Sequence, residues 1–246
     1  MFRDSVVIVT GASSGIGWAV ARACAAAGHS IVVAARRAEP LQRLVQEIID
    51  SGGVATAVKA DVRDPASMVA MAEAAVARYG RIDMLVANAG IGCRESVADA
   101  SDDVVKDVFE TNVLGVVRSV KAVLPLMIER RHGHIFTLSS VSTRLEWPND
   151  ALYASSKAAV SRFSAGLANE VRPHGILVTD VIPGVIETPL TSGMDEVRKV
   201  PPQIVANAIV RAIGTRRKII VAPPWYRVLF LLHSVAPSLV ERVLAR

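Results

Sequence analysis

The sequence is poor in the residues on which small disulfide-bonded and zinc-binding proteins depend. Its 246 residues include two cysteines, Cys24 and Cys93, which are far apart and show no CxxC spacing. Five histidines give a single H-x-H, at 132–134, beside a glycine at an expected helix end. Neither a disulfide framework nor a metal site is therefore expected.

Aromatic residues are also scarce, at 4% of the chain, and the 28 lysines and arginines are scattered rather than clustered. The net charge of +5 is compatible with an acidic ligand or an anionic surface. Nucleic-acid binders, however, usually carry dense basic runs with interleaved aromatic residues, which this chain lacks. No nucleic-acid partner is expected.

A secretory signal is not visible either, because strand-like residues begin at Ser5, directly after "MFRD". Together with the low cysteine content, this predicts a reducing, cytoplasmic location.

What the sequence does contain is a regular alternation of apolar runs and helical stretches. Apolar residues make up 51% of the chain, with an excess of Ala and Val that is typical of parallel sheets buried on both faces. The pattern predicts an α/β fold with one Rossmann-like, doubly wound domain over residues 1–222, in which helices flank a seven-stranded parallel sheet. The expected strands are 4–10, 30–36, 53–62, 81–90, 133–140, 175–184 and 218–222, and the expected helices are 15–28, 40–52, 65–79, 101–130, 151–172 and 202–214.

The remaining segment, 223–246, has apolar residues at helical spacing, and Pro237 is expected to divide it into two helices. We predict an amphipathic extension packed on the domain, with an oligomer contact or a peripheral membrane contact as alternatives. It contains no apolar run approaching the ~18 residues that cross a bilayer. The apolar positions are Trp225, Val228, Leu229, Leu232, Val235, Ala236, Leu239, Val240, Val243 and Leu244.

A glycine-rich turn, "TGASSGIG" (10–17), joins the first expected strand to the first expected helix. Gly11 would allow the tight turn, Gly15 a close approach of the backbone to a pyrophosphate, and Gly17 the packing of the helix on the sheet. The N–H groups at the start of the helix would then face the phosphates. This arrangement predicts a dinucleotide site.

The glycine spacing here is G-x-x-x-G-x-G, and six further motifs follow it along the chain. They are "ADV" (60–62), "ANAG" (87–90), "TNVLG" (111–115), "LSSVS" (138–142), "YASSK" (153–157) and "PGVIET" (183–188). In these motifs, from Ser5 to about Ala222, the chain resembles the short-chain dehydrogenases/reductases.

The resemblance implies a catalytic set of Asn112, Ser140, Tyr153 and Lys157. Tyr153 and Lys157 are four residues apart, and so share one helix face. Because a phenol with a pKa of about 10 is a poor acid/base at neutral pH, we expect the ammonium to lower it. Ser140 would stabilise the charge that develops on a carbonyl oxygen. By the resemblance, Lys157 also holds the nicotinamide ribose, and Asn112 holds a water that replaces the proton.

The same resemblance implies a set of residues that contact the cofactor. They are Gly11, Ser13, Ser14, Gly15, Ile16, Gly17, Arg36, Arg37, Asp61, Val62, Asn88, Ala89, Gly90, Tyr153, Lys157, Pro183, Gly184, Val185, Ile186 and Thr188.

The end of the second expected strand favours NADP(H) over NAD(H). It carries Arg36 and Arg37, whose guanidinium groups suit a 2′-phosphate, and no acid before Glu39. The basic residue that often precedes the second motif glycine in NADP-dependent relatives is Ser14 here. NAD(H) therefore stays an alternative.

We thus predict an NADP(H)-dependent oxidoreductase that interconverts a ketone or aldehyde and an alcohol, and the resemblance implies a homodimer or homotetramer. The substrate is expected to be apolar, with Ile91, Val141, Leu145, Trp147 and Leu190 as its walls. A non-catalytic dinucleotide sensor, or an epimerisation or dehydration on the same scaffold, are alternatives.

Overall fold

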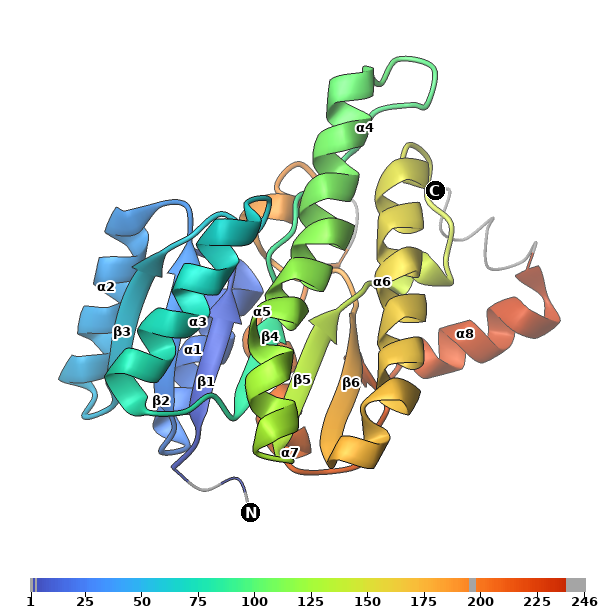
Figure 1. Ribbon diagram of the computed structural model, residues 1–246. Coiled ribbons are helices and arrows are strands. Elements are labelled where there is room, and N and C mark those ends of the chain that lie inside the picture. The colour runs from blue at the N-terminus through green and yellow to red at the C-terminus, as the bar shows by residue number, and fades with distance from the viewer. Residues whose placement is uncertain (1, 3, 195–197, 238–246) are drawn as a thin grey trace.

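The computed structural model describes residues 2, 4–194 and 198–237, and a parallel sheet of seven strands lies at its centre (Figure 1). The strands are β1 (Val6–Thr10), β2 (Ser30–Ala35), β3 (Val54–Lys59), β4 (Met84–Ala87), β5 (Gly133–Leu138), β6 (Ile176–Pro183) and β7 (Ile219–Ala222). Their order, β3-β2-β1-β4-β5-β6-β7, confirms the predicted doubly wound sheet. Since the winding reverses between β1 and β4, a ligand is expected beyond the carboxyl ends of these strands.

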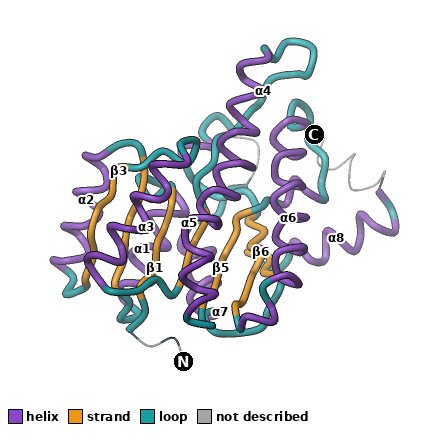
Figure 2. Tube along the Cα trace, in the orientation of Figure 1, coloured by secondary structure: helices purple, strands orange, loops and turns teal. Residues whose placement is uncertain are grey.

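Helices cover both faces of the sheet (Figure 2). Successive side chains of a strand point to opposite faces. In β1, Val7 and Val9 therefore pack against α1 (Gly15–Ala26), α2 (Ala38–Asp50) and α7 (Gln203–Ala212), whereas Val6 and Ile8 pack against α3 (Pro65–Tyr79) and α5 (Gly115–Glu129). Helix α6 (Ala151–Glu170) contributes Val160 and Leu167 to the second cluster. Two buried cores thus explain the nearly continuous apolar strands.

The helix expected over 101–130 is interrupted. It consists of α4 (Asp102–Phe109), a π-helical turn at Glu110–Leu114 and α5. The combined helix, Asp102–Glu129, is long and apolar enough by length and composition to cross a membrane. Its lower part, α5, packs on the sheet as a core helix does, and α4 rises above the sheet (Figure 1).

The segment after β7 forms a helix, α8 (Tyr226–Val235), that extends from the body of the protein (Figure 1). Its inner side chains, Tyr226, Leu229 and Phe230, pack on a small cluster with Val141, Leu145, Ile182 and Val221. Its outer side chains are apolar and exposed, and they are Trp225, Val228, Leu231, Leu232 and Val235. The second helix predicted after Pro237, with Leu239, Val240, Val243 and Leu244, lies outside the described residues.

Candidate active site

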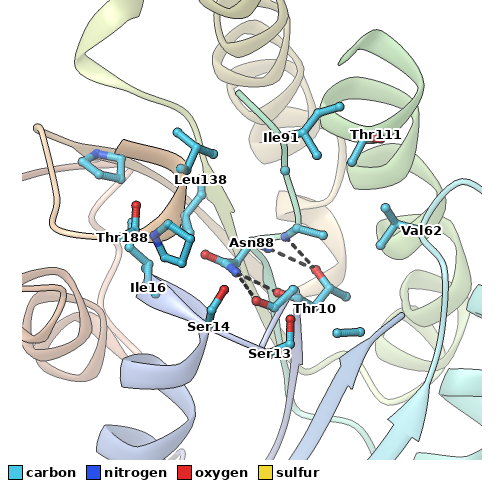
Figure 3. Close-up of a pocket in the computed structure, with 18 of the residues that line it drawn as sticks. Thr10, Ser13, Ser14, Ile16, Val62, Asn88, Ile91, Thr111, Leu138 and Thr188 are labelled. Carbon is cyan, nitrogen blue, oxygen red and sulfur yellow. Dashed lines mark hydrogen bonds between the residues drawn. The ribbon is translucent and has the colours of Figure 1, made fainter. Parts of the chain in front are cut away.

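A cavity of about 300 Å³ lies beyond the carboxyl ends of the strands, where the switch in winding predicts a ligand site. Segments that follow β1 to β6 line it, and Figure 3 shows several of their side chains directed at the same space. The sequence-predicted residues among its walls are Gly11, Ser13, Ser14, Gly15, Ile16, Arg36, Arg37, Asp61, Val62, Asn88, Ala89, Gly90, Ser140, Tyr153, Lys157, Pro183, Gly184, Ile186 and Thr188.

In the turn after β1, the backbone of Gly11 lies in contact with the backbone of Ala89. Gly11 has a φ of +67°, and a Cβ there would lie 2.7 Å from the Cα of Ala89. Only glycine satisfies both the left-handed conformation and this close approach. The turn leads to Ser14, the N-cap residue of α1, which makes no side-chain capping bond. The N–H groups of the first turn of α1 are therefore not satisfied by a cap and remain available to an anion.

Asn88 and Thr10 hold this turn against the end of β4, as the dashed lines in Figure 3 show. The Asn88 side-chain amide donates to the carbonyls of Thr10 and Gly11, at 2.9 and 3.2 Å. The Thr10 hydroxyl accepts from the N–H groups of Asn88 and Ala89, at 3.1 and 3.2 Å. These bonds tie the two strands at the switch in winding. Asn88 therefore shapes the cavity floor in addition to lining it.

Tyr153 and Lys157 lie on the same face of α6, with the Lys157 Nζ 5.7 Å from the centre of the Tyr153 ring. Although the ring is partly exposed to the cavity, burial of the hydroxyl raises the pKa of Tyr153 to about 12, and a hydrogen bond with Ser140 opposes this rise. Burial also lowers the pKa of Lys157 to about 8, against the charge of Asp180. The pKa of the phenol is therefore raised where the sequence predicted a lowering, because desolvation outweighs the Ser140 hydrogen bond and the charge of Arg94.

Ser140 stands at the point where β5 leaves the sheet. It caps a short 3₁₀ turn, Val141–Thr143, and its hydroxyl accepts from the Ser142 N–H at 3.1 Å. The cap fixes the hydroxyl beside the Tyr153 phenol. The Ser140 hydroxyl also donates to the Ser142 hydroxyl at 3.2 Å, and Ser140 and Tyr153, from different segments, line the same cavity.

Asn112 lies behind the cavity wall, fully buried inside the π-helical turn. Its amide accepts from the Ile91 N–H at 2.8 Å and donates to the Ile91 carbonyl at 2.9 Å and to the Ser156 hydroxyl at 3.0 Å. A Cβ at Gly90 would lie 3.1 Å from Asn112 Oδ1 and 3.2 Å from Lys157 Nζ. Asn112 therefore joins the loop after β4 to α6, and Gly90 leaves space for both side chains.

The opposite end of the cavity is bordered by charged groups. Arg63 holds the Asp61 carboxylate through three contacts of 2.9 to 3.2 Å, and this pairing lowers the pKa of Asp61. The Arg37 guanidinium donates to the Ser13 hydroxyl at 3.1 Å. The charge of Arg36 also acts on Asp61. Two arginines thus border the cavity beside β2.

Two further residues of the predicted cofactor set do not line the cavity. Gly17 is packed beneath the turn, because a Cβ there would lie 2.5 Å from Asn88 Nδ2 and 2.6 Å from the Gly11 carbonyl oxygen. Val185 is buried, and its N–H donates to the Tyr226 hydroxyl at 3.4 Å. Both support the cavity wall from behind.

Among the expected substrate walls, Ile91 and Leu190 line the cavity. Val141 and Leu145 are instead buried under α8, and Trp147 packs against the same cluster. The reason is that α8 covers this loop, which sequence spacing alone does not reveal.

Sequence reasoning missed four residues near the site: Thr10, Arg63, Tyr226 and Asp180. Thr10 belongs to the glycine-rich motif, and its position at the carboxyl end of a strand was the available signal. Arg63 follows Asp61 by two residues, within reach of a side-chain pair. Tyr226 and Asp180 carry no local signal, because their partners are 41 and 23 residues away in the chain.

The geometry agrees with comparisons to known proteins. The family model for short chain dehydrogenases matches residues 5–199. This chain is a short-chain dehydrogenase. It is an oxidoreductase, and the resemblance found in the sequence motifs is confirmed.

Individual short-chain dehydrogenases match most of the chain. Dehydrogenase/reductase SDR family member 7B of Bos taurus is 38% identical, over 99% of this chain and 81% of the relative. A short-chain dehydrogenase/reductase of Burkholderia phymatum in complex with NAD superposes with a TM-score of 0.88 at 26% identity, over 97% of this chain and 95% of the other. A variant of actinorhodin polyketide ketoreductase with NADPH superposes with a TM-score of 0.83 at 33% identity, over 89% of this chain and 95% of the other.

Proposed function

We propose that this short-chain dehydrogenase is an NADP(H)-dependent carbonyl reductase that acts on an apolar ketone or aldehyde. The observation that carries the proposal is the meeting of Ser140, Tyr153 and Lys157 in one cavity with the glycine-rich turn. A proton donor and a hydroxyl donor stand at one end, and a backbone anion site and two arginines at the other.

The residues of the cavity fit a nicotinamide dinucleotide. Its pyrophosphate would meet the uncapped N–H groups at the start of α1, where the absence of a Cβ at Gly11 keeps the turn close to Ala89. Its adenosine would lie between Asp61–Val62 and the arginines, and its nicotinamide beside Pro183, Gly184 and Thr188. The bound dinucleotide would supply the hydride.

Tyr153 is the proton donor of this proposal. Reduction of a carbonyl adds a hydride to carbon and a proton to oxygen, so the oxygen must lie within hydrogen-bond reach of an acid. A phenol with a pKa of about 12 remains protonated at neutral pH and yields its proton only to a strong base such as a developing alkoxide. The elevated pKa therefore keeps Tyr153 in the protonated form that carbonyl reduction requires.

Ser140 and Lys157 assist this transfer without giving up a proton permanently. The Ser140 hydroxyl donates to the same carbonyl oxygen and stabilises its growing negative charge. The Lys157 ammonium, near the Tyr153 ring, stabilises the phenolate left after the proton has moved. Asn112 holds the Ile91 backbone and, through Ser156, the helix that carries both residues.

The preference for NADP(H) rests on the charges beside β2. Arg36 and Arg37 border the cavity, and Arg37 is oriented by its bond to Ser13. Glu39, the nearest following acid, pairs with Arg43 on the outer surface of α2 and is 81% exposed. A carboxylate that would bind the two ribose hydroxyls of NAD is therefore missing at this position, whereas a 2′-phosphate would meet two guanidinium groups.

The test is the loss of NADPH fluorescence with a panel of apolar ketones and aldehydes, for the wild type and for Tyr153→Phe. We expect turnover by the wild type with alcohol as the product, and binding of NADPH without turnover by the variant. Binding without turnover by the wild type across the panel would indicate a dinucleotide sensor instead. Turnover without net consumption of NADPH would indicate epimerisation or dehydration.

A further inference from the structure

A carboxyl group lies buried in the sheet behind the catalytic helix, and the mechanism above does not use it. Asp180, on β6, is 3% exposed. Its Oδ2 accepts from the Ser161 hydroxyl at 2.6 Å. No well-aligned hydrogen bond from the described residues reaches its Oδ1: the Ser139 N–H and hydroxyl donate to the Val181 carbonyl at 2.9 and 3.3 Å. These two donors are nevertheless near enough to Asp180 to lower the pKa of its carboxyl.

The partner of this carboxylate is identified by the helix above it. Ser161 and Lys157 are four residues apart on α6, and therefore share the face that covers β6. The negative charge of Asp180 raises the pKa of Lys157, and the positive charge of Lys157 lowers that of Asp180. Burial is the larger influence on both groups and acts in the opposite direction, so that overall the pKa of Lys157 is lowered to about 8 and the pKa of Asp180 is raised. Each charge thus offsets part of the desolvation cost of the other.

Among the described groups, Asp180 is the charge that acts on Lys157 against burial. Glu110, on the π-helical turn that packs against α6, is paired with Arg118 at 2.6 Å. His134, on β5, is neutral because burial lowers its pKa to about 3, and it bonds to Thr179 and Gly214. Strand β7 contains no ionisable side chain. Tyr153, on α6, stays a neutral phenol. Lys157 itself donates to a neutral acceptor, the Leu138 carbonyl, at 3.0 Å.

We propose that Asp180 is a positioning residue of the reductase, whose carboxylate, oriented by Ser161, keeps the buried Lys157 ammonium charged while the enzyme works. The proposal rests on the function proposed above, in which that ammonium stabilises the Tyr153 phenolate. Asp180 is not among the residues that line the cavity, and in this proposal it acts through Lys157.

The test follows the protonation of Lys157 directly, by the ¹³Cε chemical shift of its side chain during a pH titration. The chain has six lysines, and Lys157→Met identifies the resonance. In Asp180→Asn, which keeps shape and loses charge, we expect the midpoint of Lys157 to fall by about one pH unit, a roughly tenfold weaker proton affinity. The matched control, Ser161→Ala, keeps the carboxylate and is expected to shift the midpoint by less than half as much. An unchanged midpoint in Asp180→Asn would overturn the proposal.

A measurement on the wild type keeps the proposal testable if Asp180→Asn does not fold. The ¹³Cγ shift of Asp180 is expected to be that of a carboxylate throughout the titration of Lys157. The proposal would be contradicted if Asp180 stayed protonated at every pH up to the titration midpoint of Lys157. A neutral carboxylic acid has no charge with which to stabilise the ammonium form of Lys157.

Activity then separates this proposal from the proposed function. In Asp180→Asn, the fall of kcat/KM at high pH should move to lower pH by the same amount as the lysine midpoint. If wild-type enzyme reduced no carbonyl compound, the proposed function would fail, and the two titrations would still decide the role of Asp180.

Discussion

The two ends of the cavity are built in different ways. The end proposed to bind the cofactor phosphates (the phosphate end) is formed by residues 10–17 with Arg36 and Arg37, and its backbone groups are held by close contacts such as that of Gly11 with Ala89. The end proposed to carry the catalytic groups (the catalytic end) is formed by Ser140, Tyr153 and Lys157, which are side chains from two segments. Here burial favours the neutral form of each ionisable group: it raises the pKa of Tyr153 and lowers the pKa of Lys157.

The difference shows what each end tolerates. At the phosphate end one added methyl group collides with backbone, whereas charge is supplied by surface arginines and helix amides. At the catalytic end, shape matters less than which group holds a proton. A conservative substitution should therefore be damaging for steric reasons at one end and for electrostatic reasons at the other.

The largest effect is expected from removal of the proton donor. Tyr153→Phe should lower kcat by about 10²- to 10⁴-fold, because it removes the phenol that donates the proton in the proposed reaction. NADPH affinity, measured by fluorescence titration, should change little. A loss of NADPH binding as large as the loss of kcat would mean that the two ends are not separate.

A steric substitution should break the phosphate end. Gly11→Ala places a Cβ 2.7 Å from the Ala89 Cα in a left-handed backbone, so NADPH affinity should fall about 100-fold, with destabilisation of about 1–3 kcal/mol. Gly28→Ala is the matched control, since Gly28 has a φ of +88° with nothing within 4 Å. Calorimetry and thermal unfolding should show an intact NADPH site in the control. Equal losses in both variants would show that backbone strain, not contact, is responsible.

A charge substitution at the phosphate end should alter cofactor choice. Arg37→Ala should weaken NADPH binding about tenfold to 100-fold and leave NADH binding unchanged, because a charged hydrogen bond is worth about 1.5–3 kcal/mol. Arg43→Ala, on α2 shortly after Arg37 but paired with Glu39, serves as control. If Arg37→Ala weakened the binding of NADPH and NADH equally, Arg37 would not contact the 2′-phosphate.

The pH profile should show the smallest effect. Lys157 loses its proton as pH rises through about 8, whereas Tyr153, with a pKa of about 12, stays protonated. Carbonyl reduction should therefore be constant well below pH 8, and kcat/KM should fall up to about tenfold per pH unit above it. A profile that stays flat to pH 10 would show that the charge of Lys157 is not required.

Much of the fold was predictable because its signals are local. Alternation of apolar runs and helical stretches predicts all seven strands, and the glycine-rich turn predicts where the first helix begins. The expected strands at 53–62 and 81–90 are longer than β3 (Val54–Lys59) and β4 (Met84–Ala87). Their last residues, including Asp61, Val62 and Asn88, form the loops that line the cavity. Apolar and small residues continue past the last strand-pairing hydrogen bonds of β3 and β4, so the amino-acid composition does not show where these strands end.

The sequence by itself determined the family and the order of the elements, and it predicted the reactive side chains, since all of these depend on spacing along the chain. Only the tertiary structure decided the protonation of Tyr153 and Lys157, the placement of Asp180 behind them and the covering of Val141 and Leu145 by α8. Desolvation depends on everything packed around a group, and those neighbours come from segments far apart in the chain.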